Sequence, residues 1–482
     1  MTAAPGDEVV AMRAYRQALA VGDYALASRA GATLVKAGVA PPDTALLAFA
    51  IALKNRDPAG AGRAAELIAR GPFDFLAPAL KAWLAFDRGE DAVAQLDAAP
   101  GDALARRYTS RHRVLLLIAA KRTNEAMAAL AVELAARDSD DARIDAALLL
   151  GRSGARDQAK RLLAGGRVEF TRLQKQFGKN GKPGAAFGAA RMFLELAVEI
   201  AGEDMQPLSV LLTRAALLLD PRDDRARLFL AEALSEGGSH DLALGVLAEV
   251  RKNSPFERGA AAGRVAALRR AGRVPEALPL AERLAGDARA TSADSETWGD
   301  MLVDLGRFDQ AAQAYAAAIG RTGGEGNWML HYLQGRALDR AGRWSEALPA
   351  LQRAVVLGPE QAPALKYLGY AQVARGENLA EAQALLERAR ALKPEDAEIA
   401  DSLAWALFQR GDVIRALPLL EQAVKGDPSA ARANEHLGDA YWRLGRHYEA
   451  RYAWRAATLT AENDANTRLE GKLAHGLKPR TN

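Results

Sequence analysis

The chain has 482 residues, of which 49% are hydrophobic, 26% charged and 6% aromatic. Its 64 basic and 60 acidic residues nearly balance, and we find no concentrated basic stripe of the kind that nucleic-acid binding requires. The absence of cysteine excludes disulfides and thiolate metal sites, and apolar runs such as 114–120 are too short to span a membrane.

Residues 1–164 are predicted to form about five degenerate helical hairpins. Turn-like segments rich in glycine, aspartate and asparagine recur here, and each is followed by a small residue. The gap between the first and second of these small residues leaves room for one more hairpin near residues 57–65. The small residues are Ala27, Ala94, Ala126 and Ala159.

Residues 165–190 interrupt this pattern and are predicted to be a loop or an insertion rich in glycine and lysine. Ala159 and the next small residue of the series, Ser209, lie 50 positions apart, so the segment breaks the register. A long connection inside a repeat array is often functional or mobile, and a plain surface loop is the alternative. The stretch 178–183 lacks the spacing of a phosphate-binding loop, and we therefore expect no cofactor.

Residues 191–460 repeat regularly, with a small residue about every 34 positions. A second small residue follows each member of the series after 12 or 13 positions. A helix–turn–helix period of this length resembles the tetratricopeptide repeat. The first series is Ala197, Ala231, Val265, Gly299, Gly335, Gly369, Ala404 and Gly438, and the second is Ser209, Ala243, Ala277, Ala311, Ala347, Ala382, Ala416 and Ala450.

One repeat shows why the small residues recur. Apolar residues at three- and four-residue steps predict one helix ending at Gly342 and a second ending before Pro359. We expect Gly335 and Ala347 to lie where the two helices cross. The predicted fold is therefore all-α, a right-handed superhelical solenoid of about thirteen tetratricopeptide-type hairpins. Residues 461–482 are predicted to form a capping helix and a tail at its C-terminal end.

Patterns for catalysis or metal binding are not found. The six histidines are dispersed and form no zinc-ligand motif, and no nucleophile elbow or acid–base pair stands out. We therefore predict that the chain is not an enzyme and has neither a catalytic nor a metal site.

The inner face of the solenoid is the predicted binding surface. The first helix of each repeat lines the concave side, and over residues 329–445 its inward positions interleave aromatic and charged side chains, as binding hot spots do. The alternative is that the aromatic residues pack between neighbouring repeats. The predicted protein-binding residues are Tyr332, Arg336, Asp339, Lys366, Tyr370, Asp401, Trp405, Phe408, Glu435, Asp439 and Trp442.

Residues 330–477 resemble a more specific group of proteins. The segments 401–403 and 436–439, with Trp405, Trp442 and Trp454, are similar to the end of a tetratricopeptide family of Gram-negative bacteria. That family resembles the outer-membrane lipoprotein adaptor of a periplasmic carboxy-terminal processing protease. The resemblance implies an adaptor that activates the serine protease and brings it substrates such as cell-wall hydrolases.

Two alternatives stay open: a general cytoplasmic scaffold or co-chaperone, and a peptidoglycan- or glycan-binding module. The lysine–asparagine pairs of carboxylate-clamp repeats are absent from the inward positions. The first residues show no signal peptide, and no cysteine is present for a lipid anchor. We expect a periplasmic, outer-membrane-associated protein if this N-terminus is mature or truncated, and a cytoplasmic one otherwise.

Overall fold

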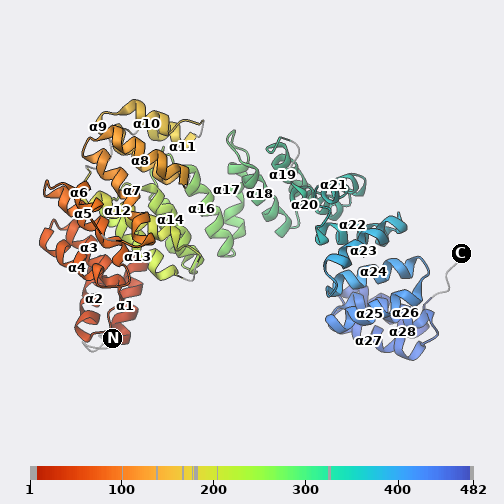
Figure 1. The fold of residues 1–482 in the computed structure, drawn as a ribbon. Coiled ribbons are helices and arrows are strands. Elements are labelled where there is room, and N and C mark those ends of the chain that lie inside the picture. The colour runs from red at the N-terminus through yellow and green to blue at the C-terminus, as the bar shows by residue number, and fades with distance from the viewer. Residues whose placement is uncertain are drawn as a thin grey trace. The chain divides into compact units, whose positions relative to one another are not determined.

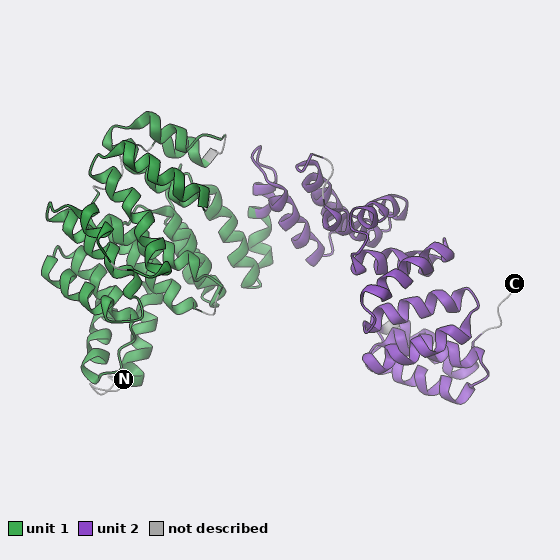
Figure 2. Cartoon of the chain, viewed as in Figure 1, with its two compact units in different colours: residues 1–280 green, residues 281–482 purple. Residues whose placement is uncertain are grey.

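The computed structural model describes α-helices throughout, with one short 3-10 helix, η1 (Asp74–Leu76), and no strand among the described residues. The helices fall into two compact units, residues 1–280 and residues 281–482 (Figure 2). The predicted all-α fold of stacked hairpins is confirmed. The described residues are 8–99, 101–136, 139–165, 168–175, 177, 183–202, 205–323 and 327–477.

Unit 1 begins with five hairpins. They pair α1 with α2, α3 with α4, α5 with α6, α7 with α8 and α9 with α10. The hairpin helices are α1 (Glu8–Val21), α2 (Tyr24–Ala37), α3 (Asp43–Lys54), α4 (Pro58–Ala69), α5 (Ala77–Asp87), α6 (Ala92–Asp97), α7 (Ala103–Ala119), α8 (Thr123–Ala136), α9 (Asp140–Ser153) and α10 (Arg156–Leu162). The other helices of this unit are α11 (Val168–Gln174), α12 (Ala185–Glu199), α13 (Gln206–Leu219), α14 (Asp224–Glu236), α15 (His240–Ala248) and α16 (Glu257–Arg270).

Helix α17 (Val274–Ala285) contains the boundary between the units, and the remaining helices form unit 2. Each odd-numbered helix from α19 to α27 pairs with the even-numbered helix before it. They are α18 (Ser292–Asp304), α19 (Phe308–Gly320), α20 (Trp328–Arg340), α21 (Trp344–Leu357), α22 (Ala362–Arg375), α23 (Leu379–Leu392), α24 (Ala397–Gln409), α25 (Val413–Gly426), α26 (Ala431–Arg443), α27 (His447–Thr458) and α28 (Asn463–His475).

The hairpin of α20 and α21 shows how the sequence specifies one repeat. The side chain of Asn327 caps α20 by accepting a hydrogen bond from the Leu330 amide at 2.9 Å. Gly342 has a φ of 77°, a left-handed conformation that glycine adopts without steric cost, and it turns the chain into α21. A Cβ on Gly335 would lie 2.6 Å from Cγ of Leu351, so only glycine lets the helices approach this closely.

The small residues of both series lie in the interior, as predicted. Every member of the series that begins at Ala197 is buried, and so is every member of the series that begins at Ser209. Except for Val265, these residues are glycine, alanine or serine, because a larger side chain at the crossing would push the paired helices apart. The two series of small residues therefore mark the positions where the helices of each hairpin cross.

The α12–α13 hairpin does not simply extend the N-terminal stack. Helix α12 packs against α3, α5 and α7, and α13 packs against α1 and α3, all of them first helices of their hairpins (Figure 1). The Tyr24 hydroxyl donates to the Arg214 carbonyl at 2.9 Å, and Nε of Arg214 donates to the Leu19 carbonyl at 3.1 Å. A Cβ on Gly188 would lie 2.3 Å from Nε1 of the fully buried Trp83. The hairpin thus covers first helices that an open stack would leave exposed.

The structure can be compared with three local predictions from the sequence. Ala94, predicted to be the small packing residue of its hairpin, is exposed, because α6 is only six residues long and buries Ala92 and Val93 instead. The expected loop at 165–190 contains α11 and the start of α12, and residues 166–167, 176 and 178–182 within it lie outside the described residues. Helix α28 forms where the capping helix is predicted.

Candidate functional site

The predicted protein-binding residues all lie on the first helices of four successive hairpins in unit 2. Each of these helices packs against the next first helix as well as against its own partner, which brings side chains 28 to 37 positions apart into contact. Helix α20 carries Tyr332, Arg336 and Asp339, α22 carries Lys366 and Tyr370, α24 carries Asp401, Trp405 and Phe408, and α26 carries Glu435, Asp439 and Trp442.

Helix α24 presents a buried carboxylate beneath a stack of rings. Oδ1 of Asp401 lies 2.7 Å from Nδ1 of His436, and Nε of Arg432 donates to its Oδ2 at 2.9 Å. Burial alone would raise the pKa of Asp401, but the charges and hydrogen bonds of His436 and Arg432 outweigh it, so the pKa is lowered. The Trp405 ring stacks on His436 with centroids 3.9 Å apart and on Phe408 with centroids 4.9 Å apart.

Ion pairs link α26 to the C-terminal helix α28. Nζ of Lys472 lies 2.7 Å from carboxylate oxygens of both Glu435 and Asp439. Burial tends to raise the pKa of Glu435, but Arg468 and Lys472 lower it to about 2. Burial raises the pKa of Asp439, because Lys472 and the Trp454 indole do not fully offset it. The α26 carboxylates therefore already have intramolecular partners.

Trp442 completes the packing at this end of unit 2. Its ring lies against His447, with centroids 4.1 Å apart, and against the buried Trp454, with centroids 5.4 Å apart. A Cβ on Gly476, just after α28, would lie 1.9 Å from the Trp442 ring. Trp442, Trp405 and Phe408 thus pack within and between neighbouring repeats.

Helices α20 and α22 leave more of their inward side chains accessible. Tyr332, Arg336 and Tyr370 are half-buried. Cζ of Arg336 lies 5.2 Å from the Tyr332 ring centroid and 5.5 Å from that of Tyr367, within cation–π range. Asp339 accepts from the Tyr367 hydroxyl at 2.8 Å and pairs with Arg375, and Lys366 pairs with Glu398.

Four ring or cation partners of these residues were not among the predicted ones. Trp328 and Tyr367 contact the Tyr332 ring, His436 stacks on Trp405, and Cζ of Arg432 lies 4.5 Å from the Tyr370 ring centroid. Tyr367 and His436 follow an inward position by one residue. A register that allowed for contacts between successive first helices would have found them.

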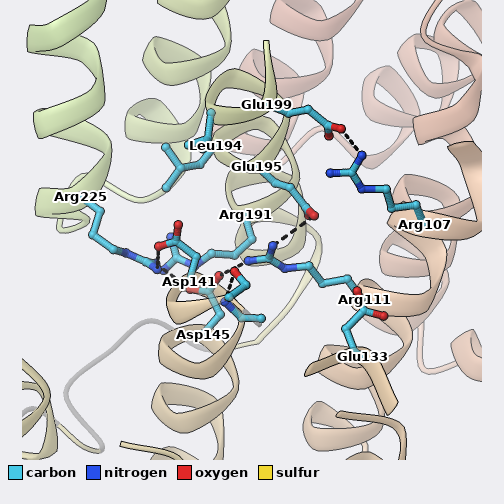
Figure 3. Close-up of a pocket in the computed structure, with 13 residues that line it drawn as sticks. Arg107, Arg111, Glu133, Asp141, Asp145, Arg191, Leu194, Glu195, Glu199 and Arg225 are labelled. Atoms are coloured by element: carbon cyan, nitrogen blue, oxygen red, sulfur yellow. Dashed lines mark hydrogen bonds and ion pairs between the residues drawn. The ribbon is translucent and has the colours of Figure 1, made fainter. Parts of the chain in front are cut away.

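A second feature, a cavity of about 200 Å³ in unit 1, was not predicted (Figure 3). Helices α7, α9 and α12 supply most of its lining, with Arg225 from α14. Figure 3 shows arginines and carboxylates from these helices pointing toward one another. The lining residues are Arg107, Arg111, Glu133, Ser139, Asp141, Ala142, Asp145, Arg191, Leu194, Glu195, Val198, Glu199 and Arg225.

Asp145 is the centre of this charged cluster. It lies 2.6 Å from an Nη atom of Arg225, 3.0 Å from Nε of Arg191 and 3.5 Å from an Nη atom of Arg111. Arg111 also holds Glu195 at 3.1 Å, yet burial raises the pKa of Glu195 to about 7, since Arg111 offsets it only in part. The ion pairs of this cluster join α9 to α12 and α14, and its charged side chains pair with one another.

A shallower groove of about 380 Å³ lies between α14 and α16 in unit 1. Its lining is mostly apolar and small, and includes Leu228 and Phe229 from α14 and Ala262 and Gly263 from α16. Among the described residues, the structure shows no cluster of three or more histidine, aspartate or glutamate side chains arranged to hold a metal ion. None of the described helices is long and apolar enough to cross a membrane.

Comparison with known proteins gives a family match for the regular repeats. The tetratricopeptide repeat model matches residues 211–258, 297–364, 332–397 and 402–466. No curated protein matches the chain in sequence.

Solved structures of repeat proteins are similar over part of the chain. A tetratricopeptide repeat protein from Parabacteroides merdae is 15% identical over 52% of this chain and 97% of its own, with a TM-score of 0.41. MamA from Desulfovibrio magneticus RS-1 is 18% identical over 35% of this chain and 94% of its own, with a TM-score of 0.32. A thermophilic repeat protein of Thermus thermophilus is 21% identical over 38% of this chain and 100% of its own, with a TM-score of 0.33.

Proposed function

We infer from the tetratricopeptide repeats of this chain that it is a non-catalytic scaffold, and we propose that unit 2 binds another polypeptide along its first helices. The observation that carries the proposal is the accessible part of that surface. On α20 and α22, half-buried aromatic side chains stand beside cations, and these are residue types enriched at binding hot spots.

The same surface is less available toward the C-terminal end of unit 2. There, Glu435 pairs with Arg468 and Lys472, Asp439 pairs with Lys472, and the Trp442 ring is packed against Trp454. We therefore place the docking surface at Tyr332, Arg336, Lys366 and Tyr370, and assign the α26 residues to the packing of the last repeat.

The finer proposal follows the resemblance of residues 330–477. It names the partner as a carboxy-terminal processing serine protease, which the chain would activate and supply with protein substrates such as cell-wall hydrolases. It places the protein in the periplasm at the outer membrane. A cytoplasmic scaffold or co-chaperone is the second candidate, because an aromatic and cationic surface would serve a peptide equally well in either compartment.

The experiment mixes the purified full-length chain with the carboxy-terminal processing protease of the same bacterium, and measures binding by calorimetry and substrate cleavage by gel. We expect binding and faster cleavage, both weakened by Tyr370→Ala. Arg353→Gln, at an exposed position of α21, is the matched control and should have no effect. Absence of binding would refute the protease partner, and equal binding by the Tyr370 variant would refute the docking surface.

A further inference from the structure

The guanidinium of Arg336 is the one inward cation of α20, and it is held by rings instead of by a carboxylate. Tyr332, one turn earlier on the same helix, and Tyr367, on α22, lie on the group at 5.2 and 5.5 Å. The structure shows no ion pair or hydrogen bond from Arg336 to any described residue. Its inward neighbours differ: Asp339 pairs with Arg375, and Lys366 pairs with Glu398.

The accessibility of the Arg336 nitrogens is uneven. Nε is buried and lacks a hydrogen-bond partner, whereas the side chain as a whole is only half-buried. With Nε buried beside the two tyrosine rings, we assign the accessible part of the group to its Nη edge. An arginine edge with two parallel N–H groups matches the two oxygens of a carboxylate.

The surroundings of Arg336 also limit what other anion it would accept. The carboxylate on its own helix, Asp339, is already paired with Arg375 and accepts a hydrogen bond from the Tyr367 hydroxyl at 2.8 Å. The aromatic walls favour an apolar group beside the charge over a fully hydrated one. A polypeptide carboxylate next to an apolar side chain has both properties.

We propose that Arg336, cradled by Tyr332 and Tyr367, is the specificity-determining residue of the docking surface and binds a carboxylate of the partner polypeptide. This inference rests on the proposed function, since it names the chemical feature that the surface selects. It differs from the lysine–asparagine carboxylate clamp, because a single arginine held between two rings does the work here. The carboxylate is that of an aspartate or glutamate side chain of the partner.

The test begins with random linear peptides displayed on phage and selected on the full-length protein. The wild-type chain should enrich peptides that carry aspartate or glutamate beside an apolar residue. Arg336→Glu should reverse this preference toward lysine and arginine, and Arg353→Gln should leave it unchanged. Peptides selected without any acidic preference, or with a preference that Arg336→Glu does not change, would overturn the inference and leave the proposed function standing. Failure to select any peptide would count against both the docking surface and the inference.

A double-mutant cycle on one selected peptide then isolates the contact. Replacing the peptide's acidic residue by its amide should weaken binding to the wild-type chain about 10- to 100-fold, the effect of losing a charge-assisted hydrogen-bonded pair. The same replacement should have almost no effect on binding to Arg336→Gln. Equal effects on the two proteins would overturn the assignment to Arg336. Amidating the peptide's C-terminus should leave binding unchanged, and loss of binding on amidation would overturn the assignment to an acidic side chain.

Discussion

The carboxyl group of Glu195 should make the stability of unit 1 depend on pH. This side chain is only 12% exposed, and burial raises its pKa from 4.5 to about 7, because Arg111 offsets the burial only in part. Since the folded chain holds the proton more tightly than the unfolded chain, the stabilisation is complete below pH 4.5 and is lost as the pH rises through 7. At about 1.4 kcal/mol per pKa unit, the loss amounts to about 3 kcal/mol.

Substitution of Glu195 by glutamine isolates this contribution. Glutamine is neutral at every pH and close in shape to the protonated acid, so the variant should equal the wild-type chain at pH 4.5 and exceed its stability by about 3 kcal/mol at pH 8. The comparison is needed because burial lowers the pKa of His112 to about 3, which makes the wild-type chain more stable as the pH rises toward 6.5.

The measurement is hydrogen exchange of the α7 and α12 amides in the full-length chain, corrected for the intrinsic pH dependence of exchange, with urea unfolding alongside it. The control is Glu133→Gln, which changes an acid that lines the same cavity and accepts a hydrogen bond from the Ser110 hydroxyl at 2.9 Å in an exposed contact. A stability difference between the Glu195 variant and the wild-type chain that stays constant from pH 4.5 to pH 8 would refute the reasoning.

Three further substitutions test the packing of the repeats. Gly335→Val should destabilise unit 2 by about 1–3 kcal/mol in urea unfolding, because its Cβ would lie 2.6 Å from Leu351. By contrast, Gly245→Ala should stabilise its helix by about 0.5–1 kcal/mol, because a Cβ there meets nothing within 4 Å. Lys472→Met should cost about 3–5 kcal/mol, because it leaves Asp439 buried without its cation, and retention of full thermal stability would show that the α28 contact is unimportant.

The repeat architecture could be predicted because each small residue meets a partner in its own hairpin. The 12-residue offset between Gly335 and Ala347 describes a crossing of two adjacent helices, and both residues are buried as expected. Contacts between successive first helices also follow the repeat, although less visibly. His436 lies 35 positions after Asp401, so the same period that locates the hairpins brings this pair together.

The packing of α12 and α13 on the N-terminal hairpins could not be predicted in this way. A repeat period encodes contacts between neighbours along the chain, whereas Arg214 bonds to the backbone near residue 19, about 195 positions away. Nothing in the spacing of Ala197 and Ser209, which continues the regular series, distinguishes this hairpin from the next. The charged cavity depends on the same long-range packing, since Arg111 and Asp145 meet Arg191 and Glu195 only when α12 lies against α7 and α9.

The two units therefore use their first helices differently. In unit 1, the α12–α13 hairpin covers α1, α3, α5 and α7, and charges such as Asp145 are paired within the chain. In unit 2, no equivalent hairpin lies on α20 and α22 in the described part of the chain, and the Arg336 edge stays open beside its tyrosines. A half-buried guanidinium gives up part of its hydration, and at Arg336 no carboxylate of the described chain compensates for that loss. Among the inward charges of unit 2, Arg336 is therefore the residue for which binding a partner explains most.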